Sequence, residues 1–226
     1  MIVFKAVRPL AAIVGLAAAG AWAPAALAQS EAPQSPSTLS PAQAPVWSVG
    51  LFGGKLYKDN LLDLIPHAFS GDLRDQNSYI SGLVVRRSLD NPGWVNAWGE
   101  WGGMPVFTGL EFGAFHHNGL LHSDELVAGW RLGATGVQWQ GLKIDVAGSF
   151  GLSHALNNPP YDNPNHTDEK NYATLFYMAP EIALRHDALP GWALALRIHH
   201  RSGIYGLVAP SHVGSNHVGL LLTRDF

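Results

Sequence analysis

The feature that most constrains the fold is an alternation of apolar and polar residues in the C-terminal segment from Gly191 to Phe226. Successive side chains of a β-strand point to opposite faces, so alternate residues share a face. The even-numbered row consists of Trp192, Leu194, Leu196, Ile198, His200 and Ser202. The odd-numbered row carries Arg197, His199 and Arg201. The segment therefore predicts a hairpin whose first strand has one apolar face and one charged face.

The same alternation recurs upstream, in residues 142–152 and 172–184. The charged positions expected on the polar faces of the strands are Glu111, Glu125, Arg131, Lys143, Asp145, Glu181, Arg185 and Arg197. Strands that are apolar outside and polar inside are typical of membrane β-barrels, and the barrel lumen is where such charges can pair. Only 14% of residues are charged, while there are 25 glycines and 8 tryptophans, which also fits a barrel with aromatic girdles.

Eight segments are strand candidates: 46–54, 77–88, 94–116, 122–133, 141–154, 172–186, 191–203 and 216–226. Gly102, Gly103 and Pro105 interrupt the third, which we interpret as one kinked strand because closed bacterial barrels have an even strand number. The sequence thus predicts an all-β fold, an eight-stranded antiparallel transmembrane outer-membrane β-barrel over residues 46–226.

The links between these candidates indicate the topology. Links 89–93, 134–140 and 187–191 are short, whereas 55–76, 155–171 and 204–215 are long. The link after the third candidate strand is also short and departs from this alternation. Short periplasmic turns and longer outer loops are typical of outer-membrane barrels. We therefore expect both termini in the periplasm, the end of the seventh strand at the outer leaflet, and a short helix in loop 55–76 that packs on the barrel mouth.

The N-terminus has the marks of an export signal. Lys5 and Arg8 precede an alanine-rich apolar run, and Ala26-Leu27-Ala28 forms a cleavage site. We expect residues 1–28 to be a signal peptide and the proline-rich residues 29–45 to be a disordered linker. The absence of cysteine excludes a disulfide framework, and the net charge of −3 gives no indication of a nucleic-acid partner.

Two other fold interpretations stay open at this point. A soluble periplasmic barrel or sandwich would turn the same apolar rows inward. The C-terminal Phe226 favours the membrane barrel, whereas Arg224 stands where a membrane strand often has an aromatic residue.

His200 and Ser202 are the candidate catalytic pair, because two residues at i and i+2 on a strand share a face. A serine hydroxyl needs a neighbouring base to attack an ester near neutral pH. The simpler interpretation is a hydrated polar rim above the hydrocarbon, since His-x-Ser alone is a weak motif.

Arg197-Ile198-His199-His200-Arg201-Ser202-Gly203, followed by Gly214-Ser215-Asn216 and the closing strand, resembles the C-terminal signature of the PagL family, the lipid A 3-O-deacylases. The resemblance implies an outer-membrane serine hydrolase that removes an ester-linked 3-hydroxyacyl chain from lipid A. It implies Ser202 as nucleophile and His200 as base. The family's acidic residue falls at Asn216, which would orient His200 without a charge. Gly203 replaces an asparagine that binds the oxyanion, so only its backbone N–H is expected there.

The resemblance implies lipid A or lipopolysaccharide of the outer leaflet as the partner, and neither metal nor cofactor. Arg201 and Arg87 are candidates for lipid A phosphates, although such arginines are more often rim charges. The spacings of His116, His117, His122, His212 and His217 match no compact metal-ligand set. His199 is expected in the lumen, beside a carboxylate. The sequence leaves open whether two copies pair, and a non-catalytic barrel with a structural or adhesion role is the rival function.

Overall fold

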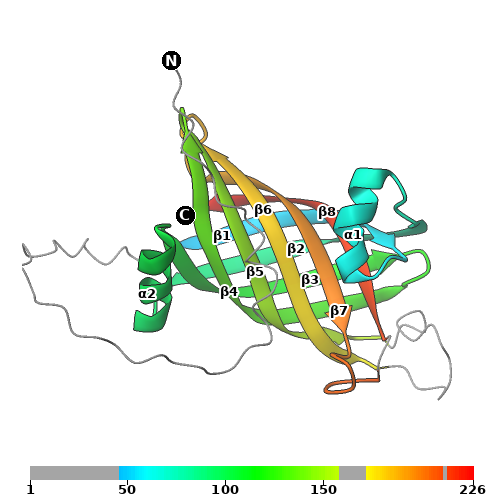
Figure 1. Ribbon diagram of the computed structural model, residues 1–226. Helices are drawn as coiled ribbons and strands as arrows, with labels where there is room; N and C mark the ends of the chain where they lie inside the picture. Colours follow the sequence, from blue (N-terminus) through cyan, green and yellow to red (C-terminus); the bar gives the residue numbers. More distant parts are fainter. Residues whose placement is uncertain (1–45, 158–171, 211–212) are drawn as a thin grey trace, which may run out of the picture. The chain divides into compact units, whose positions relative to one another are not determined.

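The computed structural model describes residues 46–157, 172–210 and 213–226, and these form a closed antiparallel barrel of eight strands (Figure 1). Each strand pairs with the next along the chain, and β8 pairs with β1 to close the barrel. The strands are β1 (Trp47–Tyr57), β2 (Asp75–Leu89), β3 (Val106–Asn118), β4 (Ser123–Trp139), β5 (Leu142–Ala155), β6 (Thr174–His186), β7 (Trp192–Ser202) and β8 (Gly214–Asp225). The predicted strand number and antiparallel order are confirmed.

The two faces of each strand follow the alternation in the sequence. On β7 and β8, Leu196 and Leu220 are each 55% exposed, whereas Arg197 is completely buried. Apolar side chains thus cover the outside of the barrel and charged side chains fill its lumen. A soluble barrel or sandwich would place its apolar side chains inside, so the interpretation of this chain as a soluble periplasmic protein is wrong. The strands of 11 to 17 residues are long enough for the roughly 9–11 residues that a membrane requires.

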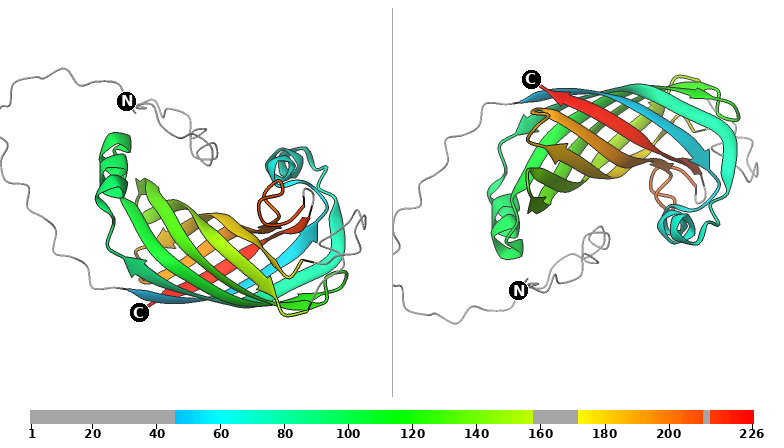
Figure 2. Two further views of the ribbon diagram at one scale, coloured as in Figure 1. Left: turned by 90° about the horizontal axis from the view of Figure 1, so that it is seen from below. Right: turned by 90° about the horizontal axis from the view of Figure 1, so that it is seen from above.

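Two short helices accompany the barrel, one at each end (Figures 1 and 2). Helix α1 (Leu61–Ser70) lies in the link between β1 and β2, where a helix was expected, and it buries Leu64. Helix α2 (Gly93–Gly102) lies between β2 and β3. We call the two ends of the barrel the α1 end and the α2 end. Neither helix in the described ranges is long and apolar enough to cross a membrane.

Helix α2 corrects the prediction for residues 94–116. The first part of that segment is helical, and the strand begins only at Val106. The helix ends at Gly102 and is capped by Gly103, whose φ of +62° lies in the left-handed region that glycine adopts without strain. The predicted tight turn after the second strand is therefore also wrong, because α2 occupies that link.

The link after the fourth strand is shorter than predicted. β4 continues to Trp139, and only Gln140 and Gly141 separate it from β5. Both residues have positive φ, +47° and +82°, as a two-residue hairpin turn of the favoured hand requires. The predicted signal peptide (1–28) and linker (29–45) lie outside the described residues, as does His212.

Candidate functional site

The predicted pair of strands brings His200 and Asn216 together at the α1 end. They are direct partners in the β7–β8 ladder, and both face outward, half-buried. His200 Nδ1 lies 2.5 Å from Asn216 Oδ1. The contact predicted between these two side chains is present.

The amide of Asn216 is fixed by a second contact. Its Nδ2 donates a 2.8 Å hydrogen bond to the backbone carbonyl of Asp59, which follows β1. A carbonyl oxygen only accepts, so the amide must present Nδ2 to Asp59 and Oδ1 to His200. His200 Nδ1 must then carry the proton. In the neutral ring, Nε2 is left with a free lone pair, which is the atom that a general base uses.

Ser202 lies two residues beyond His200 on the same outward face. Its Oγ accepts a 3.1 Å hydrogen bond from the backbone N–H of Ile204, so its own proton is free to be donated. Within the described part of the chain, no hydrogen bond joins Ser202 to His200. Their Cα atoms are about 6.8 Å apart in a regular strand. A rotamer change is therefore needed to bring Ser202 Oγ within hydrogen-bond distance of His200 Nε2.

Gly203 does not fill the oxyanion role predicted for it. Its N–H donates a 3.1 Å hydrogen bond to the carbonyl of Val213, and its own carbonyl accepts from Val208 and Ala209. Both backbone groups are engaged in the turn between β7 and β8. A side chain at this position would meet the Ala209 carbonyl at 2.3 Å, so the tight turn itself accounts for the glycine.

The two arginines predicted to meet phosphates are placed elsewhere. Arg201 is fully buried in the lumen, where Nε donates to Ser153 Oγ at 2.8 Å, so it cannot reach a lipid headgroup. Arg87 is exposed but pairs with Trp47, at the opposite end of β1 from the Asn216 partner Tyr57. Ten residues of strand separate the two positions by roughly 33 Å. Neither arginine can share a substrate with Ser202.

A clamp around Asp59 holds the segment that orients Asn216. The buried carboxylate of Asp59 accepts hydrogen bonds from the Arg74 backbone N–H at 2.8 Å, from Arg74 Nε at 3.0 Å and from His67 Nδ1 at 2.7 Å. Burial by itself would raise the pKa of Asp59, but these hydrogen bonds outweigh it and lower the pKa to about 2. Helix α1 and the start of β2 are thereby tied to the chain segment beside Asn216.

The sequence did not point to this clamp. Asp59, His67 and Arg74 lie in a loop for which no role was expected, and their contacts depend on how α1 folds back. Asp59 lies one residue before Asn60, the N-cap of α1, and aspartate is common near helix starts, so the residue alone carries no signal of a link to Asn216.

The lumen is filled by paired charges. Glu111 and Glu181 receive hydrogen bonds from three arginines, namely Arg86, Arg131 and Arg197. Tyr177 donates to Glu111 at 2.8 Å. Of the eight lumen charges predicted, only Lys143 departs from the expectation, because it pairs with Asp187 near the α2 end. Eight strands leave room for such side chains but not for a water-filled channel.

A comparison with protein-family models found no match, and neither did a comparison with curated proteins. Solved structures do match. The outer membrane enzyme PagL superposes with a TM-score of 0.50 at 13% identity, over 80% of this chain and 99% of that chain. The fold is that of an eight-stranded outer-membrane barrel.

Two other solved structures have lower TM-scores. They are the N-terminal β-barrel domain of Pseudomonas aeruginosa OprF (0.41, 11% identity) and Neisserial surface protein A (0.43, 6% identity). Each covers 80% of this chain, and the chain covers 97% and 96% of them respectively. At these identities the likeness concerns the fold, and the site must be judged on its own geometry.

Proposed function

We propose that this protein is an outer-membrane ester hydrolase of the lipid A deacylase type, acting from the α1 end in the outer leaflet. The observation that carries the proposal is the oriented imidazole of His200. Asn216, itself fixed by the Asp59 carbonyl, holds the Nδ1–H form of His200 and leaves Nε2 available on the face of β7 that also carries Ser202. Rim residues that only contact lipid headgroups do not require a histidine held in one tautomer by a chain of hydrogen bonds.

The reaction follows from these roles. Ser202 Oγ attacks the carbonyl carbon of an acyl ester while His200 Nε2 takes the hydroxyl proton. The tetrahedral intermediate collapses, the sugar alkoxide leaves, and His200 returns the proton to it. Water then cleaves the acyl-enzyme with His200 again as base, which releases a fatty acid and restores Ser202. Because His200 and Ser202 continue the apolar outward row of β7, an acyl chain lying in the membrane reaches them directly.

Specific observations favour the rival, a barrel with a structural or adhesion role. No carboxylate faces His200 in the described contacts, and the Gly203 N–H is already bonded. Losing one oxyanion donor typically raises a barrier by about 2.7–4 kcal/mol. Under this alternative, His200 and Ser202 are hydrated rim residues.

A fluorophosphonate probe distinguishes the two functions without knowledge of the substrate. The probe transfers its phosphonyl group to an activated serine hydroxyl and loses fluoride. We expect the folded wild-type barrel to be labelled on the peptide that contains Ser202, and His200→Ala to be labelled far more slowly. The matched control Ser215→Ala removes a neighbouring serine whose side chain is buried in the lumen, and it should label as the wild type does. Absence of labelling at Ser202 would favour the structural role.

A further inference from the structure

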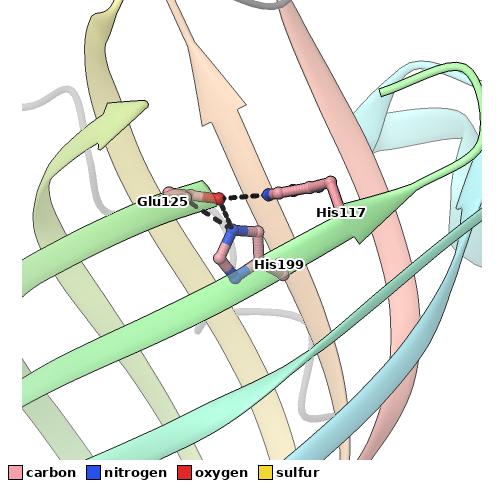
Figure 3. Close-up of side chains that lie close together, drawn as sticks. All are labelled: His117, Glu125 and His199. Carbon is pink, nitrogen blue, oxygen red and sulfur yellow. Dashed lines mark hydrogen bonds and ion pairs between the residues drawn. The ribbon is translucent and has the colours of Figure 1, made fainter. Parts of the chain in front are cut away.

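A second polar cluster lies inside the barrel, on the lumen side of the strand that carries His200. It consists of His117 from β3, Glu125 from β4 and His199 from β7, all of them buried (Figure 3). His117 Nε2 lies 2.6 Å from Glu125 Oε2, and His199 Nε2 lies 3.0 Å from the same oxygen. The two imidazoles and the carboxylate converge, with their nearest atoms within 4.8 Å of one another.

The sequence predicts His199 beside a carboxylate but does not predict the cluster, because its three members come from three different strands. The histidine spacings along the chain match no ligand motif, so the sequence predicts no metal site. Barrel closure places β7 across the lumen from β3 and β4, which brings His199 to the other two residues (Figure 3). Its predicted carboxylate partner is Glu125.

An independent observation at the same place is the side chain of His217. It is completely buried, and within the described part of the chain neither of its ring nitrogens has a hydrogen-bond partner. Its ring centroid lies 5.0 Å from that of His117 and 6.1 Å from that of His199. A buried imidazole with both nitrogens unpaired is costly, and a metal ion that binds the unprotonated nitrogen reduces that cost.

We propose that these residues form a binding site for a divalent transition-metal ion of the Zn²⁺ class. Nε2 of His117, Nε2 of His199 and the carboxylate of Glu125 are the ligands, because their donor atoms already lie within 4.8 Å of one another, and His217 supplies a fourth once its ring turns toward the ion. Imidazole nitrogen with one carboxylate is a common ligand set for Zn²⁺, whereas Ca²⁺ and Mg²⁺ require oxygen ligands throughout.

Two contacts of Glu125 affect metal binding in opposite directions. Ser153 Oγ donates a 2.6 Å hydrogen bond to Oε1, while Oε2 lies within hydrogen-bond distance of both histidines, and such a second partner orients a ligating carboxylate. Arg201 Nε lies 3.6 Å from Oε1 and adds a positive charge that weakens the attraction for a dication. The site therefore favours an ion that binds nitrogen strongly over one held by charge alone.

A metal ion at this position would join β3, β4, β7 and β8 across the lumen. His199 is adjacent to His200 in the chain and lies opposite His217 in the β7–β8 ladder. The inference concerns the inner face of these strands and holds whether or not the outer face is hydrolytic.

The test uses the purified full barrel in detergent micelles, without a polyhistidine tag. The protein is stripped with a chelator, reloaded with ZnCl₂ and desalted, and zinc is counted by plasma mass spectrometry. We expect one Zn²⁺ per chain, a higher unfolding temperature with zinc than without, and a visible ligand-field spectrum of low-symmetry Co²⁺ after cobalt loading. His199→Gln and Glu125→Gln preserve side-chain size and should each weaken zinc binding at least tenfold.

Controls make the result decisive. His116→Gln alters an exposed histidine on the same strand as His117 and should bind zinc as the wild type does. Folding of every variant is verified by its heat-dependent mobility on gels, and Glu125→Gln serves if a histidine variant does not fold. The proposal is overturned if the wild type retains no stoichiometric zinc, or if His116→Gln loses zinc while His199→Gln and Glu125→Gln retain it.

Discussion

At the scale of single residues, the chemistry of Asn216 limits what the site can do. An amide oxygen orients the imidazole of His200, but it adds no charge when that ring takes up a proton. Replacing the amide by a carboxylate changes the hydrogen bond from a neutral one to a charged one, a difference of about 1.4 kcal/mol or about tenfold in rate.

We therefore predict that Asn216→Asp, which gains a charge opposite His200 but loses the hydrogen bond from Nδ2 to the Asp59 carbonyl, hydrolyses an acyl ester faster than the wild type by at most about tenfold. Asn216→Ala, which neither orients nor charges His200, should fall by about 10²-fold. Initial rates on lipid A in micelles measure both. A rate for Asn216→Ala equal to that of the wild type would show that Asn216 has no part in the reaction.

Sequence reasoning succeeded at this scale where strand parity decides the outcome. The outward faces of His200, Ser202 and Asn216 follow from alternation alone. It was wrong for Gly203, because a turn determines which backbone N–H groups are free. It was also wrong for Arg201, since that residue belongs to the inward row and pairs across the lumen.

At the scale of elements, the segment from the end of β1 through α1 contacts the candidate site through the hydrogen bond between Asn216 and the Asp59 carbonyl. Its attachment depends on the ionised carboxylate of Asp59, whose hydrogen bonds to Arg74 and His67 lower its pKa to about 2 from an ordinary value of 3.8. A lowered pKa means that the contribution is complete above pH 4 and is lost as the pH falls toward 2.

We predict that amide hydrogen exchange in residues 58–74 remains slow from neutral pH to about pH 4 and rises as Asp59 is protonated, once the intrinsic pH dependence of exchange is subtracted. Asp59→Asn should show the faster exchange already at neutral pH, because hydrogen bonds to a charged group contribute about 1.5–3 kcal/mol. Asp72→Asn, in the same loop, is the matched control. Equal protection in Asp59→Asn and the wild type would contradict the clamp.

Element boundaries were predictable where periodicity and turn residues agree and not elsewhere. The segment Gly93–Gly102 contains tryptophans at positions that suit a strand as well as a helix, so its sequence does not separate the two. The helix is accommodated because the chain there lies beyond the barrel wall, where no ladder partner is available. α1 was expected from its leucines, but its clamp was not.

At the scale of the whole molecule, the barrel is held by outward apolar rows in lipid and by paired charges in the lumen. Arg197 has no exposed surface and donates hydrogen bonds to both Glu111 and Glu181. Removal of one partner from a buried ion network leaves uncompensated charge, which commonly costs about 3–5 kcal/mol.

We predict that Arg197→Met lowers the free energy of unfolding of the barrel by about 3–5 kcal/mol, measured by urea titration in lipid vesicles with tryptophan fluorescence. Arg224→Met, whose guanidinium lies over Trp192 on the outside, is the control and should change stability by less than about 1 kcal/mol. If the two substitutions have equal effects, the lumen network does not hold the barrel together.

The central claim, an acyl-ester hydrolase at the α1 end, is tested most directly by mass spectrometry of lipid A. Lipid A is extracted from cells that express the wild type, Ser202→Ala or Ser215→Ala at matched levels in the outer membrane. The account predicts that the wild type and Ser215→Ala remove one ester-linked 3-hydroxyacyl chain and that Ser202→Ala does not. Lipid A that is unchanged by the wild type, or deacylated equally by Ser202→Ala, would contradict it.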